Sequence, residues 1–312
     1  MSTRSRLQLK VAATVVAAAC AAGGVVGAGH ARRSHPAALS AFAVPAPLVR
    51  SAVGGAAHPN TTTAPAKNAK KGVSAWSFPG ARTALSKSGV SWYYTWATNH
   101  NGITTPKGVH FVPMIWGAGS VTTASLQQAR RSAHVLLAFN EPDMSSQSNL
   151  TVASALNLWP KLMATGMRLG SPAVAYGGDT PGGWLDQFMR GAAARHYRVS
   201  FITLHWYGGD FTTAAAVSQL KSYIQAVWNR YHKPIWLTEF ALIRFGATTV
   251  YPSPQQQAAF VTAATTMLQR ISYVWRYAWF SLPASSTDGS VGLFRSGAVP
   301  TTPGRAFEKV GS

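Results

Sequence analysis

From residue 73 onward, eight short runs of apolar, β-branched and aromatic residues alternate with polar and amphipathic segments. Most of these runs are almost continuously apolar, which is typical of parallel strands that are buried on both faces. The pattern therefore predicts eight parallel strands. They cover residues 73–78, 91–97, 110–117, 134–141, 167–174, 199–207, 234–240 and 274–282.

Helical patterns separate the later runs, and Ser, Thr or Pro near their starts is typical of helix N-termini. The crossovers around 80–89 and 98–109 are short, so helices there should be reduced. Alternating strands and helices predict an α/β protein, and eight strands in about 240 residues fit a compact (β/α)8 TIM barrel. An open doubly wound sheet is the alternative, but no G-x-G-x-x-G follows the first run. We expect full helices over residues 123–132, 151–167, 184–196, 213–231 and 254–271.

The N-terminal part of the chain differs from this pattern. Residues 1–10 are basic and residues 11–29 are small and apolar, so residues 1–31 are predicted to be a signal peptide. An uncleaved membrane anchor is the alternative, because about 19 residues approach the spanning minimum. Residues 32–71 are rich in Ala, Pro, Ser and Thr and hold no acid, which predicts a disordered basic linker. We therefore expect a secreted protein whose barrel covers residues 72–312.

Charge narrows the possible partners. The 312 residues include 28 Lys and Arg but only 8 Asp and Glu, which gives a formal net charge of +20. Nine of these bases and none of the acids precede residue 73, yet the predicted barrel is itself basic. We expect electrostatic association with an anionic cell wall or membrane surface. Positive charge alone permits nucleic-acid binding, but no DNA- or RNA-binding motif is present, so we expect no nucleic-acid partner.

Cysteine and histidine usage limits metal chemistry. The only cysteine is Cys20, which excludes a disulfide framework and a Cys-based metal site. The nine histidines form no close pair along the chain. We therefore expect neither a metal ion nor another cofactor.

Two of the three glutamates lie where a barrel places its chemistry. Glu141 ends the fourth run and Glu239 lies near the end of the seventh, whereas Glu308 reads as an ordinary surface residue. Catalytic groups of such barrels lie at the carboxyl ends of strands. Glycoside hydrolysis needs one protonated carboxyl and a second, ionised one. The alternative is a pair of structural acids, but burying ionised carboxylates is costly. The pattern thus indicates a glycoside hydrolase.

Neighbouring polar residues complete the candidate site. Asn140 could donate to a sugar hydroxyl, although a local turn at the strand end is the alternative. His205 and Tyr207 share one face of the sixth strand and could hold Glu239, while a structural histidine is the alternative.

Aromatic residues at strand ends are candidate sugar platforms, although core packing will explain several of them. The aromatic candidates nearest the strand ends are Trp96, Trp116, Trp206 and Trp279.

The combined motifs resemble glycoside hydrolase family 128, within clan A of the retaining barrel glycosidases. Their order and spacing cover most of the predicted barrel. The motifs are Phe-Val-Pro-Met-Ile-Trp at 111–116, Phe-Asn-Glu-Pro-Asp at 139–143 with Gln147-Ser148-Asn149 following, Gly170-Ser171-Pro172-Ala173, Trp184-Leu185-Asp186, His205-Trp206-Tyr207 and Pro-Ile-Trp-Leu-Thr-Glu-Phe at 234–240.

The resemblance implies an endo-acting β-1,3-glucanase that works with retention. It makes Glu141 the acid/base and Glu239 the nucleophile of a double displacement on β-glucan. Strand-end motifs do not fix the linkage, so a β-1,4-glucanase or a mannanase is an alternative. A secreted glucan-binding protein without turnover is the other alternative, although the presence of both glutamates argues against it.

The resemblance also gives roles to the residues around the glutamates. Asn140 would contact the sugar beside the scissile bond, His205 and Tyr207 would support the nucleophile, and Trp279 would floor the cleaved sugar's site. One departure is Val-Ser-Phe at 199–201, where the family often has an Asp before the apolar strand. We expect a monomer.

Overall fold

The computed structural model describes residues 69–285 and 291–311. All of them belong to one compact unit of the chain. The predicted signal peptide and residues 32–68 of the predicted linker lie outside the described residues. The first strand begins at Lys71, so it includes the last residue that was assigned to the linker.

No helix in the part of the chain that the structure describes is long and apolar enough to cross a membrane.

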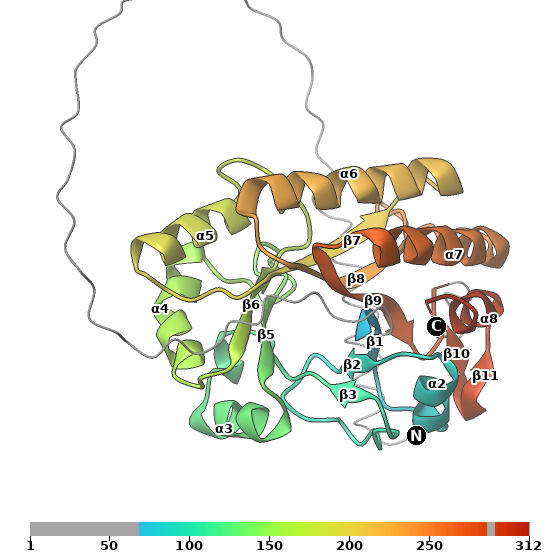
Figure 1. The fold of residues 1–312 in the computed structure, drawn as a ribbon, viewed down its shortest axis with the longest axis horizontal. Helices are drawn as coiled ribbons and strands as arrows, with labels where there is room; N and C mark the ends of the chain where they lie inside the picture. The colour runs from blue at the N-terminus through green and yellow to red at the C-terminus, as the bar shows by residue number, and fades with distance from the viewer. Residues whose placement is uncertain (1–68, 286–290, 312) are drawn as a thin grey trace, which may run out of the picture. The chain divides into compact units, whose positions relative to one another are not determined.

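The strands form a ring of parallel neighbours (Figure 1). Hydrogen-bonded order runs β3-β2-β1-β9-β8-β7 in one sheet and β4-β5-β6 in another. Parallel bridges from Gly170 to Phe201 and from Val174 to Leu204 join β6 to β7. The strands are β1 (Lys71–Ala75), β2 (Trp92–Tyr94), β3 (His110–Phe111), β4 (Met114–Ile115), β5 (Val135–Asn140), β6 (Arg168–Ala173), β7 (Ile202–Gly208), β8 (Ile235–Leu242) and β9 (Val274–Leu282).

The third strand of the ring is divided in two at Val112 and Pro113. Its first part, β3, pairs with β2, and its second part, β4, pairs with β5. Pro113 has no N–H to give to a ladder, but its carbonyl still accepts from the N–H of Leu137 at 3.0 Å. The two parts therefore act as one strand position, and the ring closes with eight. The (β/α)8 barrel that the sequence predicts is confirmed.

Helices cover the outside of the ring, and the first crossovers are reduced as expected. Helix α2 has only seven residues, and residues 98–109 form no helix. Side-chain caps start several helices: Thr122 and Thr151 each accept an N–H three residues on, and Ser253 forms a capping box with Gln256. The helices are α2 (Ala81–Lys87), α3 (Thr123–Ser132), α4 (Val152–Met163), α5 (Trp184–Ala194), α6 (Thr213–Tyr231), α7 (Pro254–Arg270) and α8 (Thr302–Glu308).

Short elements that the sequence pattern did not predict complete the chain. Strands β10 (Phe294–Arg295) and β11 (Val299–Pro300) pair antiparallel before α8. Two short 3-10 helices, η3 (Ala118–Ser120) and η4 (Ser296–Ala298), lie after β4 and between β10 and β11.

The core has two layers. The larger lies between the strands and the helices, and the smaller contains side chains from strands on all sides of the ring, so it fills the barrel interior. Successive side chains of a strand face opposite ways, which is why Trp92 and Tyr94 belong to the inner layer and Tyr93 to the outer one. The inner layer contains Trp92, Tyr94, Val112, Met114, Leu137, Phe201, Trp236 and Ala278.

Candidate active site

Glu239 lies inside the barrel on β8, where its side chain is fully buried. The Oε1 atom accepts from the indole N–H of Trp96 at 2.7 Å and from the hydroxyl of Tyr94 at 3.0 Å. The Oε2 atom accepts from the hydroxyl of Tyr207 at 2.5 Å. Three aligned donors fix the orientation of this carboxyl group.

A bulge in β8 aims Glu239 inward. The register with β7 passes from Leu204 opposite Leu237 to His205 opposite Glu239, so Thr238 is an extra residue. Such an insertion reverses the alternation of faces beyond it. Trp236 and Glu239 consequently both face the interior.

Glu141 directly follows β5, and only 6% of it is exposed. Its backbone adopts a positive φ of 41°, and its N–H donates to the carbonyl of Ala173 at 2.7 Å. Left-handed backbone is uncommon for a residue with a side chain and is found most often at functional sites. The turn directs the carboxyl toward the barrel axis, where Nδ1 of His205 lies 2.9 Å from its Oε1.

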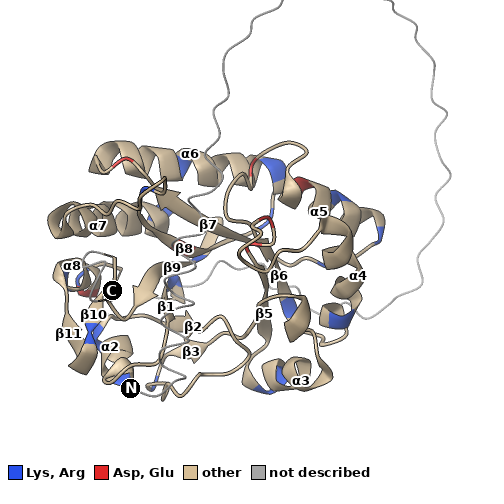
Figure 2. Cartoon of the chain, turned by 180° about the vertical axis from the view of Figure 1, so that it is seen from behind, with Lys and Arg blue, Asp and Glu red and all other residues tan. Residues whose placement is uncertain are grey.

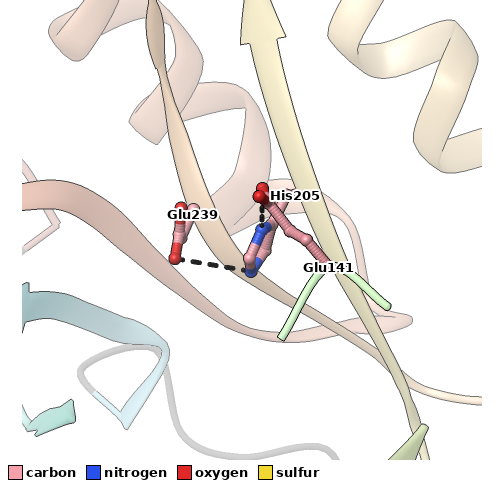
Figure 3. A group of neighbouring side chains, drawn as sticks. All are labelled: Glu141, His205 and Glu239. Carbon is pink, nitrogen blue, oxygen red and sulfur yellow. Dashed lines mark hydrogen bonds and ion pairs between the residues drawn. The ribbon is translucent and has the colours of Figure 1, made fainter. Parts of the chain in front are cut away.

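His205 lies between the two carboxyl groups (Figure 3). Its Nδ1 meets Glu141, and its Nε2 lies 3.6 Å from Oε1 of Glu239. One oxygen of each glutamate and one ring nitrogen all lie within 4.8 Å of one another. The three side chains that the sequence assigned to the site therefore lie together, and their catalytic and supporting roles stay predictions.

The pKa values of Glu141 and His205 are both raised. Burial raises the pKa of Glu141, the contact with His205 opposes the rise, and the charge of Glu239 adds to it. Burial lowers the pKa of His205, but the negative charges of Glu239 and Glu141 outweigh it, so the pKa is raised. Burial and Glu239 raise the pKa values of Tyr94 and Tyr207 well above the usual value, so both hydroxyls stay protonated donors.

Two side-chain amides with unused hydrogen-bonding capacity, those of Asn140 and Gln147, lie beside Glu141. Asn140 ends β5, is 1% exposed, and donates through Nδ2 to Oε1 of Gln147 at 3.4 Å. Its Oδ1 and the Nε2 of Gln147 have no partner among the described residues. Buried polar atoms are normally paired, so this pair has hydrogen-bonding capacity that a ligand could use.

Comparison with known proteins agrees with this geometry. Residues 72–307 match the family model "Glycosyl hydrolase catalytic core". A crystal structure of a family 128 (subgroup I) endo-β-1,3-glucanase from Amycolatopsis mediterranei, in complex with laminaritriose, is 60% identical with a TM-score of 0.74. The match covers 77% of this chain and 98% of that one. The chain belongs to glycoside hydrolase family 128.

Two more distant relatives mark the range of similarity. A family 128 (subgroup II) endo-β-1,3-glucanase from Sorangium cellulosum is 31% identical, with a TM-score of 0.66 over 77% of this chain and 98% of its own. Alkali-sensitive linkage protein 1 of Schizosaccharomyces pombe is 32% identical over 212 residues, which are 65% of this chain. The match spans only 36% of that curated relative.

Two of the four aromatic candidates lie at the carboxyl end of the barrel of this family 128 protein. Trp96 bonds to Glu239 and stacks on Trp76 with ring centroids 4.1 Å apart. Trp116 follows β4, is half-buried, and packs against the inner layer. Both positions agree with the prediction of sugar contacts, which stays a prediction.

The other two aromatic candidates require a correction. Trp279 is fully buried in the outer layer, where it packs against Phe240 with ring centroids 5.0 Å apart and donates to the carbonyl of Val291. Trp206 stacks on Phe260 of α7 with centroids 5.7 Å apart. Both side chains point outward because their neighbours along the strand point inward. Neither contacts the carboxylates, so their role is packing between strands and helices.

Sequence reasoning missed Tyr94, which donates to Glu239, as a site residue. Tyr94 is two positions before Trp96. Because side chains two positions apart on a strand face the same way, the choice of Trp96 could have indicated Tyr94 as well. Tyr176 follows β6 and is 60% exposed, beside the strand end that carries Glu141. An exposed aromatic ring at that position is a candidate contact for the leaving sugar.

Glu141, His205 and Glu239 could also offer ligand atoms to a metal ion. The oxygens of Glu239 already accept from Tyr94 and Trp96 and from Tyr207, as described above. The positive ends of these O–H and N–H dipoles face the space beside the carboxylate, which disfavours a cation there. The donor set therefore suits a pair of carboxyl groups sharing protons better than a metal centre.

Proposed function

We propose that this protein is an endo-acting β-1,3-glucanase that cleaves its substrate with retention of configuration. The supporting observation is the spacing of Glu141 and Glu239, which have carboxyl oxygens within 4.8 Å of each other. Retaining glycosidases hold the two groups about 5–5.5 Å apart, whereas inverting enzymes need about 6.5–9.5 Å to admit a water molecule. The endo-β-1,3-glucanases to which the chain is similar support the choice of linkage.

The first chemical step divides the roles of the two glutamates. An oxygen of Glu239 attacks the anomeric carbon, and the bond from that carbon to the glycosidic oxygen breaks. Glu141 gives its proton to the departing oxygen, which leaves as an alcohol. Its raised pKa suits this role, because a carboxyl with an ordinary pKa would be ionised at neutral pH.

The second step hydrolyses the glycosyl-enzyme ester. Esterification removes the negative charge of Glu239, and with it one cause of the raised pKa of Glu141. Glu141 is then ionised more readily and takes a proton from the water that attacks the anomeric carbon. The carboxylate of Glu239 leaves, and both residues return to their starting forms.

Product analysis on linear β-1,3-glucan with three matched variants tests this proposal. Glu141→Gln and Glu239→Gln should each lower release of oligosaccharides by at least about 10³-fold. Glu308→Gln, at the third glutamate, should act as wild type. Cellulose and mannan should not be cleaved. Unchanged release by either site variant, or an inverted anomer as first product by NMR, would contradict the proposal.

We also propose that the protein is secreted and acts as a monomer on polysaccharide near an anionic surface. The basic and then apolar N-terminal residues and the acid-free segment up to residue 72 support this location. N-terminal sequencing of protein from the culture medium should find a start near Ala28 or Ala31. A cell-bound chain that retains its N-terminal residues would contradict secretion.

A further inference from the structure

Two arginines meet at the amino end of the barrel, opposite the carboxylates. The guanidinium of Arg276 lies 4.5 Å from the ring centre of Trp236 and 5.4 Å from that of Trp92. Arg168, the first residue of β6, places its guanidinium 5.2 Å from the ring centre of Trp275 on β9. Strands β7 and β8 separate β6 from β9 in the ring, so the Arg168 side chain reaches across this end.

Neither guanidinium has a hydrogen bond or ion pair with any residue between 69 and 285 or between 291 and 311. Other bases at this end have such partners. Lys71 donates to the carbonyls of Phe307 and Val310, and Arg198 donates to that of Met167. Arg168 and Arg276 differ from these bases because they have no such acceptor among the described residues.

The chain offers these arginines few acids as partners. Lys and Arg far outnumber Asp and Glu in the described residues (Figure 2). The four residues that lead into and open each strand position of the ring include no Asp or Glu. The segment before β1 cannot supply one either, because residues 1–72 contain no acid.

A buried donor beside Arg276 also lacks a partner among the described residues. The indole N–H of Trp236, under the Arg276 guanidinium, is buried and has no partner among the described residues. Burial and the neighbouring Arg168 lower the pKa of Arg276 to about 10. Bringing two like charges and an unpaired donor together is costly, and such clusters are enriched at binding sites.

We propose that the amino end of the barrel binds a phosphate group between the guanidiniums of Arg168 and Arg276. Each guanidinium lies over an indole ring, and its N–H groups have no acceptor among the described residues, so they are available for a planar, two-point contact with an oxyanion. Two positive charges match a phosphate dianion. The phosphate is free in solution, part of a soluble polymer, or a lipid headgroup.

Thermal unfolding of the purified full-length protein in inorganic phosphate tests the site. Phosphate should raise the Tm of the wild type saturably, above the effect of sodium chloride at equal ionic strength. Arg168→Gln, which changes an exposed side chain, should weaken apparent phosphate affinity at least tenfold. Arg82→Gln, which removes the same charge from exposed α2, should bind phosphate as the wild type does. Equal shifts in phosphate and chloride, or equal affinity of Arg168→Gln and wild type, would overturn the site.

Arg276→Lys and a vesicle assay complete the test. The lysine keeps the charge but lacks the planar fork, so its phosphate affinity should fall while its Tm without phosphate stays near that of the wild type.

Sedimentation with phosphatidylglycerol vesicles, lost in Arg168→Gln and absent with phosphatidylcholine, would identify a lipid source. Binding of polyphosphate without vesicle binding would identify a soluble source. Absence of binding to inorganic phosphate, polyphosphate and vesicles would overturn the proposal.

Discussion

The two ends of the barrel carry charged groups of opposite sign, and these groups differ in their hydrogen-bond partners. At the carboxyl end, Glu141 and Glu239 are buried, and their oxygens lie against Trp96, Tyr94 and Tyr207 as donors and against the ring of His205. At the amino end, Lys71 donates to backbone carbonyls, whereas Arg168 and Arg276 rest on indole rings. Buried carboxyl groups with aligned partners at one end thus contrast with two guanidiniums at the other end that have no hydrogen-bond partner in the part of the chain that the structure describes.

The topology explains most of this polarity. In a parallel barrel each strand runs toward the N-terminus of the next helix, so the carboxyl end faces helix N-termini, which favour negative charge. The amino end faces helix C-termini, which favour positive charge. Lys70 follows this rule by donating to the carbonyls of Gln269 and Ile271 at the end of α7. Arg168 and Arg276 go beyond it, because neither has a hydrogen bond or ion pair within residues 69–285 and 291–311, and the phosphate site proposed above would account for them.

Among the variants that test this comparison, His205→Gln should have the largest effect on activity. The imidazole bridges the two carboxyls, so its loss should lower kcat by about 10²- to 10³-fold. His205 holds down the pKa of Glu141, so the variant should have a higher pKa there. Activity requires protonated Glu141 in the first step, and the alkaline limb of the pH profile should therefore move to higher pH.

A pH–rate profile of the variant beside His134→Gln, an exposed histidine before β5, measures this shift. The control should keep the wild-type profile. An alkaline limb of His205→Gln that stays in place or moves to lower pH would show that His205 does not act on Glu141.

Tyr207→Phe should have the next largest effect. Its hydroxyl donates to Oε2 of Glu239, and a hydrogen bond to a charged group contributes about 1.5–3 kcal/mol. The variant should therefore lose about ten- to hundredfold in kcat with little change in Tm. Tyr273→Phe removes a hydroxyl from an exposed bond to Gln225 and should act as wild type. Equal kinetics for the two variants would remove Tyr207 from the site.

The variants Trp96→Phe and Trp279→Phe should distinguish a tryptophan that acts in the active site from one that packs in the core. Trp96→Phe removes a donor to Glu239, so kcat should fall while Tm changes little. Trp279→Phe leaves a gap in the outer layer and should destabilise the fold by about 1–3 kcal/mol with kcat near the wild-type value. Loss of kcat in Trp279→Phe without loss of stability would restore it to the substrate site.

The comparison of these two tryptophans shows where sequence reasoning stops. Apolar runs and helix-start residues were enough to predict the eight strand positions and the main helices, and they placed Glu141 and Glu239 at the carboxyl ends of two strands. They could not predict the direction of individual side chains, because a bulge reverses the alternation beyond it. Thr238 in β8 is such a residue, and it sends Glu239 inward and Phe240 outward. Trp279 was predicted to line the cleft from its place near a strand end and from the family resemblance, and neither shows which way its side chain points.

Other features depended on contacts between distant segments. The division of the third strand at Pro113 depends on which neighbour each part meets, β2 or β5. The proximity of Arg168 and Arg276 follows from the closure of the ring, since the two residues lie far apart in sequence. His205 was predicted to support Glu239, but its closer bond is to Glu141 at 2.9 Å. The positions of Glu141, His205 and Glu239 at strand ends predict that they lie at the carboxyl end of the barrel. Which of them form hydrogen bonds depends on the register between the strands.

The smallest effect concerns Lys71, the paired cation of the amino end. Burial lowers its pKa to about 8, with Glu308 acting weakly in the opposite direction. The unfolded chain has the higher, ordinary lysine pKa, so between pH 8 and about 10.5 it binds more protons than the folded protein does. Stability attributable to Lys71 should therefore rise with pH in this window, by about 1 kcal/mol between pH 8 and 9.

Urea unfolding at pH 8 and pH 9 measures this contribution as a difference between wild type and Lys71→Met. The variant cannot titrate, so the wild type should gain stability relative to it as the pH rises. Lys309→Met, at an exposed position after α8, should follow the wild type at both pH values. A wild type that loses stability relative to Lys71→Met would mean that the folded protein holds the Lys71 proton more tightly than the unfolded chain does. In that case the carbonyls of Phe307 and Val310 would outweigh burial, and the amino end would stabilise its charges as fully as the carboxyl end does.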